Sequence, residues 1–133
     1  MSSIVALTEA ASIGLHSMVL IAKSDEILNV SKIAEFIGSS RHHVAKIMQR
    51  LSKAGFVYST RGPAGGFVLK KAPSEVTLLA IYEAIEGTLA VQTCPLSRET
   101  CPFQECILGD LSLRMSGEIK QYLENRTLQD YTD

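Results

Sequence analysis

The sequence predicts a mainly α-helical fold: a winged helix-turn-helix with a two-stranded β wing, followed by a long C-terminal dimerisation helix. Apolar residues recur at helical spacing on both sides of a short Gly-Ser joint at 38–40, and the period changes to two over 56–69. A continuous apolar stripe near the C-terminus predicts the long helix. With 133 residues the chain has room for one small domain and an arm, which excludes a large multidomain enzyme.

The composition excludes several classes of protein. With 46% hydrophobic and 20% charged residues, the chain is able to fill a core, unlike a disordered polar chain. Aromatic residues make up only 6% and Trp is absent, which argues against a stacking platform for single-stranded nucleic acid. No stretch reaches the roughly 18 apolar residues of a membrane span. Residues 1–6 lack the features of a signal peptide, so we expect a cytoplasmic protein.

Two helices are predicted before the joint. Thr8 is a suitable N-cap for the first helix, and Ser31 for a short second one. Gly38 is expected to end the second helix in the left-handed conformation. The predicted apolar faces consist of Ala11, Leu15, Met18, Val19 and Ala22 in the first helix and of Ile33, Ala34 and Ile37 in the second.

A third helix is predicted to follow almost at once, with Ser40 as its N-cap and Gly55 after its end. Because only residues 38–40 separate it from the second helix, the two must cross steeply, which is typical of a helix-turn-helix. Its buried face is predicted from the positions i, i+3, i+4 and i+7. These positions hold Val44, Ile47, Met48 and Leu51.

A β-hairpin is predicted directly after the third helix. The pattern indicates strands at 56–60 and 67–69, with the Gly- and Pro-rich stretch 61–66 as the turn between them. A hairpin in this place is the wing of a winged helix. The glycines of the turn do not form a P-loop, because a strand follows them and the Lys-Ser/Thr ending is missing.

The rest of the chain predicts two more helices. Thr77 is a suitable N-cap for a helix that ends at Gly87, and a long helix is expected to begin near Cys106. The long helix carries one apolar stripe over four turns, for which a single small domain has no obvious internal surface. We therefore expect pairing with a second chain, and packing onto the chain's own core is the alternative. The stripe consists of Leu108, Leu111, Met115, Ile119 and Tyr122.

These elements divide the chain into three predicted segments. Residues 1–75 form the winged helix-turn-helix, 76–106 the connecting helix and cysteine loop, and 107–133 the dimerisation helix and tail. Charge is unevenly distributed among them, although the net charge is only −1. Residues 41–71 carry seven basic side chains and no Asp or Glu, whereas 1–40 sum to −2 and 72–133 to −6. Such a concentration indicates a polyanion, and we expect double-stranded DNA; a solvated basic surface is the alternative.

The third helix is predicted to read DNA with the face opposite its apolar stripe. Lys and Gln suit base edges in the major groove, His suits a base acceptor or a phosphate, and the flanking Arg side chains suit phosphates. Arg61, at the base of the hairpin tip, suits a narrow minor groove. A metal site on the adjacent histidines 42 and 43 is disfavoured, since neighbours on a helix diverge by about 100°. The predicted DNA-binding residues are Ser40, Arg41, His42, His43, Lys46, Gln49, Arg50 and Arg61.

Three cysteines, Cys94, Cys101 and Cys106, lie within thirteen residues, close enough for one loop to direct three sulfur atoms at one point. Soft thiolates favour an iron-sulfur cluster, zinc or copper(I), each of which generally needs a further ligand. No histidine follows the cysteines, so a local Cys₃His zinc site is excluded. Buried thiols or redox-active thiols without a metal are the alternative.

Over nearly its whole length the chain resembles the Rrf2 family of bacterial winged-helix regulators. The resemblance rests on the stretch from Ser40 to Gly55, the wing sequence RGPAGG at 61–66, the opening Leu7-Thr8 and the three cysteines. Among the members of this family, the chain resembles the iron-sulfur and nitric-oxide sensing regulators NsrR and IscR and the iron regulator RirA. The resemblance implies a homodimer on a palindromic operator, with the third helix in the major groove and the wing arginine in the minor groove.

The resemblance also implies an iron-sulfur cluster on the cysteines, [2Fe-2S] or [4Fe-4S], with Glu9 of the partner subunit as a fourth ligand. Asp110 is the local alternative, and Glu9 has an equally good role in favouring the helix dipole. The gaps between the cysteines are six and four residues where the family more often has five and five. Gly109 stands where a ligand His is common, so the cluster type stays open.

The implied function is a repressor whose operator affinity is controlled by a cluster that senses nitric oxide, iron or redox state. The alternative is a cluster-free regulator that senses redox through its thiols. The sequence contains no dinucleotide loop, HExxH string or paired-carboxylate motif, so we do not expect an enzyme.

Overall fold

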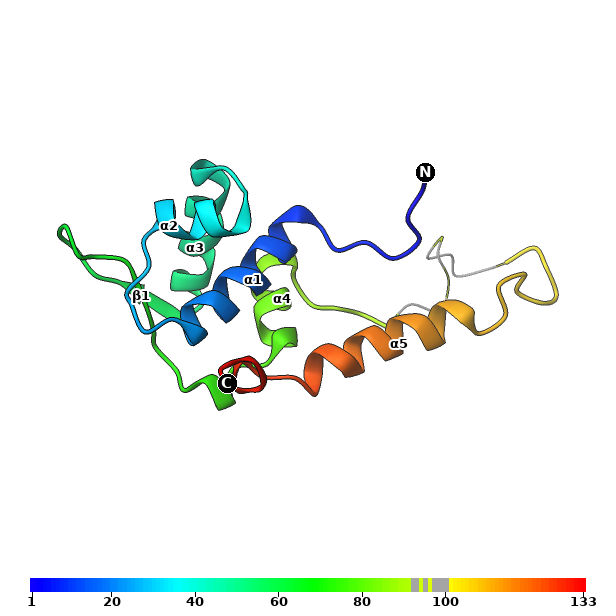
Figure 1. Cartoon of the computed structure of the whole chain (residues 1–133). Helices are drawn as coiled ribbons and strands as arrows, with labels where there is room; N and C mark the ends of the chain where they lie inside the picture. The colour runs from blue at the N-terminus through cyan, green and yellow to red at the C-terminus, as the bar shows by residue number, and fades with distance from the viewer. Residues whose placement is uncertain (92–93, 95, 97–100) are drawn as a thin grey trace.

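The computed structural model describes residues 1–91, 94, 96 and 101–133. In this part of the chain it contains five α-helices and one two-stranded sheet, which confirms the predicted winged helix. Helices α1 to α4 pack together, the wing projects to one side, and α5 extends to the other (Figure 1). The helices are α1 (Glu9–Lys23), α2 (Val30–Ile37), α3 (Arg41–Lys53), α4 (Leu78–Glu86) and α5 (Leu111–Glu124); the strands are β1 (Val57–Ser59) and β2 (Phe67–Leu69); the 3₁₀ turns are η1 (Pro73–Glu75) and η2 (Leu128–Tyr131).

The predicted caps of α1, α3 and α4 are confirmed. The Thr8 hydroxyl accepts a hydrogen bond from the backbone N–H of Ala11. Ser40 does the same for the N–H of His43 at 3.2 Å, so its hydroxyl orders the first turn of α3. Thr77 caps α4 through the N–H of Ala80.

The predicted cap of α2 is wrong. Asn29, not Ser31, is the N-cap, and its side chain accepts from the N–H of Lys32 at 2.9 Å. The reason lies outside the local pattern: the carbonyl of Leu28 accepts from the N–H of Phe67 in the wing, which holds the backbone extended until residue 28. Asn29 is therefore the first residue that is able to turn into the helix. Gly38 ends α2 in the left-handed region, with φ of 81°, as predicted.

The core lies where α1, α3 and α4 meet. All four residues predicted for the inner face of α3 are buried. They pack against residues of the other two helices, including Ile13, Met18, Ile81 and Ile85. Beside this core the wing is an antiparallel hairpin in the register Val57↔Leu69, Tyr58↔Val68 and Ser59↔Phe67. The inner face of α3 is thus fixed, and its other face is left to solvent.

Helix α5 begins at Leu111, later than the apolar pattern predicts. Leu108 precedes it, and Gly109 between them takes a left-handed φ of 58°, which ends any continuous helix there. After α5 the chain returns to the body: the N–H of Leu128 donates to the carbonyl of Val76, and the Leu128 side chain is fully buried. Among the described helices, none is long and apolar enough to cross a membrane.

Candidate nucleic-acid interface and cysteine loop

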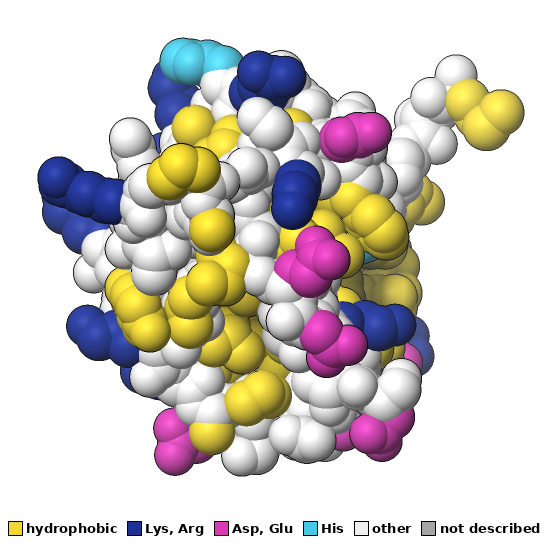
Figure 2. Space-filling view, turned by 60° about the vertical axis from the view of Figure 1, so that its left-hand side comes forward, with side chains coloured by type: hydrophobic (Ala, Val, Ile, Leu, Met, Phe, Trp, Pro, Cys, Tyr) yellow, Lys and Arg dark blue, Asp and Glu magenta, His cyan; other side chains and the backbone are white. Residues whose placement is uncertain are grey.

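The outer face of α3 is basic and open to solvent. Four residues predicted to bind DNA are exposed there: Arg41, His42, Lys46 and Gln49. The acid-free stretch 41–71 continues from this helix through the wing to the end of β2 and beyond. Figure 2 shows several Lys and Arg side chains along the left-hand edge of this face and others at its top, centre and right, whereas most of the visible Asp and Glu side chains lie in the right-hand half. The left-hand edge of this face therefore shows positive charge with few acidic groups, where a phosphate backbone would be attracted.

His43 lies beside Glu9, which the sequence predicts as a ligand of the cluster. Its Nδ1 lies 3.3 Å from Oε1 of Glu9, at the start of α1, and both side chains remain about half or more exposed. Glu9, predicted as a metal ligand, therefore lies against the first turn of α3. No sequence pattern pairs these two residues, because they come from different helices and are far apart along the chain.

Arg50 contacts the neighbouring helix α4. Its Nη1 donates to the backbone carbonyl of Ile85, 3.1 Å away in the last turn of α4. The periodicity of α3 placed this arginine beside the DNA-reading face and predicted a phosphate contact. In the structure this hydrogen bond links α3 to α4, and the Arg50 residue stays exposed; the phosphate contact stays a prediction.

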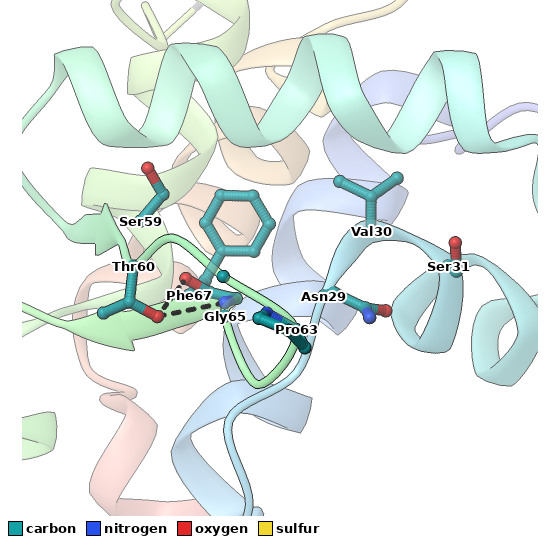
Figure 3. Close-up of a pocket in the computed structure, with 10 residues that line it drawn as sticks. Asn29, Val30, Ser31, Ser59, Thr60, Pro63, Gly65 and Phe67 are labelled. Carbon is teal, nitrogen blue, oxygen red and sulfur yellow. Dashed lines mark hydrogen bonds between the residues drawn. The ribbon is translucent and has the colours of Figure 1, made fainter.

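The wing tip carries Arg61 on an exposed turn. The turn is closed by Thr60, which exchanges backbone and hydroxyl hydrogen bonds with Gly66 (Figure 3). A Cβ on Gly66 would meet the backbone of Leu28, so only glycine fits where the wing approaches the chain before α2. An open cleft of about 360 Å³ lies between the wing and the start of α2, lined by Asn29 to Ser31 and by residues from 59 to 67.

The cysteine loop, residues 94–106, is described only in part, and position 95 and positions 97–100 lie outside the described residues. Cys101 and Cys106 are exposed, and Cys94 is half-buried. Within the described ranges, no three His, Cys, Asp or Glu side chains are close enough together to hold a metal ion. Both candidate fourth ligands have partners within the chain, since Asp110 accepts from Nε of Arg114 at 3.1 Å and Glu9 lies beside His43. The three thiols fit an iron-sulfur cluster by their chemistry, and one chain by itself does not bring Glu9 to them.

Comparisons with known proteins agree with this geometry. The model of the Rrf2 family, described as an iron-dependent transcriptional regulator, matches residues 7–133. A protein of Aquifex aeolicus (strain VF5), which carries the name of an HTH-type transcriptional regulator, is 32% identical over 109 residues, which cover 80% of this chain and 76% of that protein.

Solved structures share the fold over nearly the whole chain. The structure of CymR (YrzC), the global cysteine regulator of B. subtilis, has a TM-score of 0.78 at 26% identity and covers 97% of both chains. IscR of T. potens has a TM-score of 0.74 at 22% identity, over 96% of this chain and 85% of that one. The two-stranded wing and the helical core of this chain therefore belong to an architecture found in known regulators.

Proposed function

The chain belongs to the Rrf2 family of transcriptional regulators, and from this premise we propose that it is a cytoplasmic homodimer that represses transcription by binding a palindromic operator. As a member of this family it is a DNA-binding regulator and not an enzyme. One observation carries the proposal: the stretch 41–71, which forms α3, the wing and the two residues after β2, holds seven basic and no acidic side chains, and α3 and the wing lie on the same side of the molecule in Figure 1. The α3 helix enters the major groove, and the wing lies along the adjacent minor groove.

The side chains of the interface have different tasks in this proposal. Lys46, Gln49 and His42 contact base edges, because they lie on the outer face of α3. Arg41 contacts phosphates, and Arg61 enters the minor groove. Ser40 caps α3, because its Oγ accepts from the N–H of His43, and its O–H proton remains able to donate to a phosphate.

Helix α5 supports the proposed homodimer. Leu111 is 44% and Met115 40% exposed, so the described part of the chain leaves the first two turns of the stripe largely uncovered, whereas Ile119 packs against the core. Near its C-terminal end the helix does pack onto the core, through the buried Leu123. A second copy of α5 would cover the exposed part and place two recognition helices on two half-sites.

We further propose that Cys94, Cys101 and Cys106 hold an iron-sulfur cluster, [2Fe-2S] or [4Fe-4S], and that its state controls operator affinity. Three thiolates supply the soft donors that such a cluster requires, and the matching family model is described as iron-dependent. Glu9 of the partner subunit is the proposed fourth ligand, with Asp110 as the alternative. When bound, the cluster supplies a group that reacts with nitric oxide or oxygen, or is lost when iron is scarce.

An alternative rests on a specific observation. Two of the three thiols, those of Cys101 and Cys106, are exposed to solvent. This exposure suits a regulator that senses redox state by thiol oxidation without a cluster.

Absorbance spectra and iron and sulfide assays of protein purified without oxygen distinguish the two modes. A coloured protein with bound iron and sulfide supports the cluster. Colourless, iron-free protein whose operator affinity changes on thiol oxidation supports the alternative. Equal binding to operator and random DNA under all these conditions contradicts both.

A further inference from the structure

The C-terminal end of α4 is the point where the chain leaves the helical core toward the cysteine loop. The last carbonyls of a helix have no partners within the helix. At this end Arg50 of α3 supplies one, through the 3.1 Å hydrogen bond from its Nη1 to the carbonyl of Ile85. A cation at this place also interacts favourably with the helix dipole. Arg50 therefore connects the recognition helix to the exit of α4.

The start of α1 also contacts this end of α4. The hydroxyl of Thr8 donates to Oε1 of Glu86 at 2.6 Å. The side chain of Ile85 packs so closely on α1 that a Cβ at Gly14 would collide with its Cδ1. Because Gly14 also faces Ile47 of α3, the Ile85 side chain lies where α1 and α3 meet. The last turn of α4 is thus unable to shift without disturbing its contact with α3.

The chain after α4 is also tied to this turn. Gly87 has φ of 87° and ψ of −179°, a conformation essentially restricted to glycine. Two residues later the N–H of Leu89 donates to Oε2 of Glu83 at 2.7 Å. Cys94 follows five residues after Leu89. A pull or rotation from the cysteine loop would therefore act on the last turn of α4 first.

We infer that Arg50 is a positioning residue, which couples the state of the cysteine loop to the orientation of α3, and is not a phosphate ligand. The inference rests on the proposed function, because it assumes that the loop's state alters DNA affinity, whether through a cluster or through thiols. Its physical basis is the short chain segment from Leu89 back through Gly87 to Ile85, together with the hydrogen bond from Arg50 to the Ile85 carbonyl. In a dimer that inserts one α3 from each subunit into DNA, a small reorientation of each α3 changes how well the two helices fit the two half-sites.

The test compares Arg50→Met with Arg41→Met, a change of the same charge at the exposed start of the same helix. Binding to random-sequence duplex DNA is measured over a range of salt concentrations. Neutralisation of one phosphate contributes about 0.9 to the slope of log affinity against log salt. Arg41→Met should lower the slope by about 0.9, whereas Arg50→Met should leave it unchanged. Melting curves and circular dichroism show whether each variant is folded.

The second measurement concerns coupling. Each protein is tested before and after iodoacetamide alkylation of its exposed thiols, on a duplex selected from a random pool with the parent protein. Alkylation should change the affinity of the parent and of Arg41→Met by about fivefold or more, the lower end of typical couplings. In Arg50→Met the change should disappear. Gly87→Ala, which forces a side chain into a glycine conformation two residues after Ile85, should also reduce this change, with an unchanged salt slope.

An Arg50→Met protein with a slope lowered by about 0.9 and an intact alkylation response would overturn the inference and make Arg50 a phosphate ligand. If Arg50→Met does not fold, an intact response in Gly87→Ala would overturn it equally. A parent protein that selects no duplex would contradict the proposed function instead, and the salt slope of Arg50→Met on random DNA would still decide the role of Arg50.

Discussion

At the scale of single residues, Glu9 is the side chain on which two roles compete. In one chain it lies 3.3 Å from His43 on the recognition helix, so service as a ligand in a partner subunit would require that contact to break. We predict that Glu9→Ala leaves a less stable or spectrally shifted cluster, measured by absorbance during exposure to air. An unchanged spectrum and decay would move the fourth ligand to Asp110 or to solvent.

Base contacts belong to the same scale. Lys46→Ala or His42→Ala should reduce the discrimination between operator and random DNA by about 1–3 kcal/mol, because a base contact favours one sequence. Lys53→Ala, at the C-terminal end of α3, is the control. It should lower the affinity for operator DNA and for random DNA to a similar degree, as should Arg61→Ala. Titrations with operator and random duplexes at one salt concentration measure the ratio. If Lys46→Ala still discriminates between operator and random DNA as well as the parent does, Lys46 does not contact a base edge.

The cap of α2 gives a stability prediction. Asn29→Ala should cost about 1 kcal/mol of the free energy of unfolding, because the N–H of Lys32 loses its acceptor. Ser31→Ala is the matched control, and it should change stability by less than about 0.5 kcal/mol. Urea denaturation measures both variants. The reverse order would restore Ser31 as the cap.

At the scale of elements, α5 is the helix through which we expect the homodimer to form. Replacement of both Leu111 and Met115 with Asp should give monomers or aggregates, since two charges would enter the exposed apolar stripe. Gln121→Asp, also exposed on α5, serves as the control and should leave the dimer intact. Sedimentation at micromolar concentration reports the result. A parent protein that sediments as a 14.5 kDa monomer would contradict the dimer.

At the scale of the whole molecule, the cysteine loop and the recognition helix are expected to act together. Each change of Cys94, Cys101 or Cys106 to Ala should abolish the visible absorbance, because three thiolates hold the cluster in this proposal. Nitric oxide should then alter operator affinity in the parent and leave the three variants unaffected. An anaerobic gel-shift assay with nitric oxide added provides the measurement. If the Cys→Ala variants respond to nitric oxide as the parent does, the cysteines are not required for sensing.

The sequence by itself determined the order and type of the elements, the inner face of α3 and the concentration of positive charge on α3 and the wing. These features depend on residues a few positions apart, through helical periodicity, caps and turn glycines. The start of α2 at Val30 was different, because the wing holds Leu28 from nearly forty residues away.

Only the tertiary structure decided the partners of the individual charged side chains. Glu9 lies beside His43 because the start of α1 packs near the start of α3, and Arg50 turns to Ile85 because the end of α4 has carbonyls that need donors. The return of Leu128 to the core likewise follows from the packing of distant segments. Helical periodicity tells which face of a helix is polar, but the neighbour that a polar side chain meets depends on how whole helices are arranged in space.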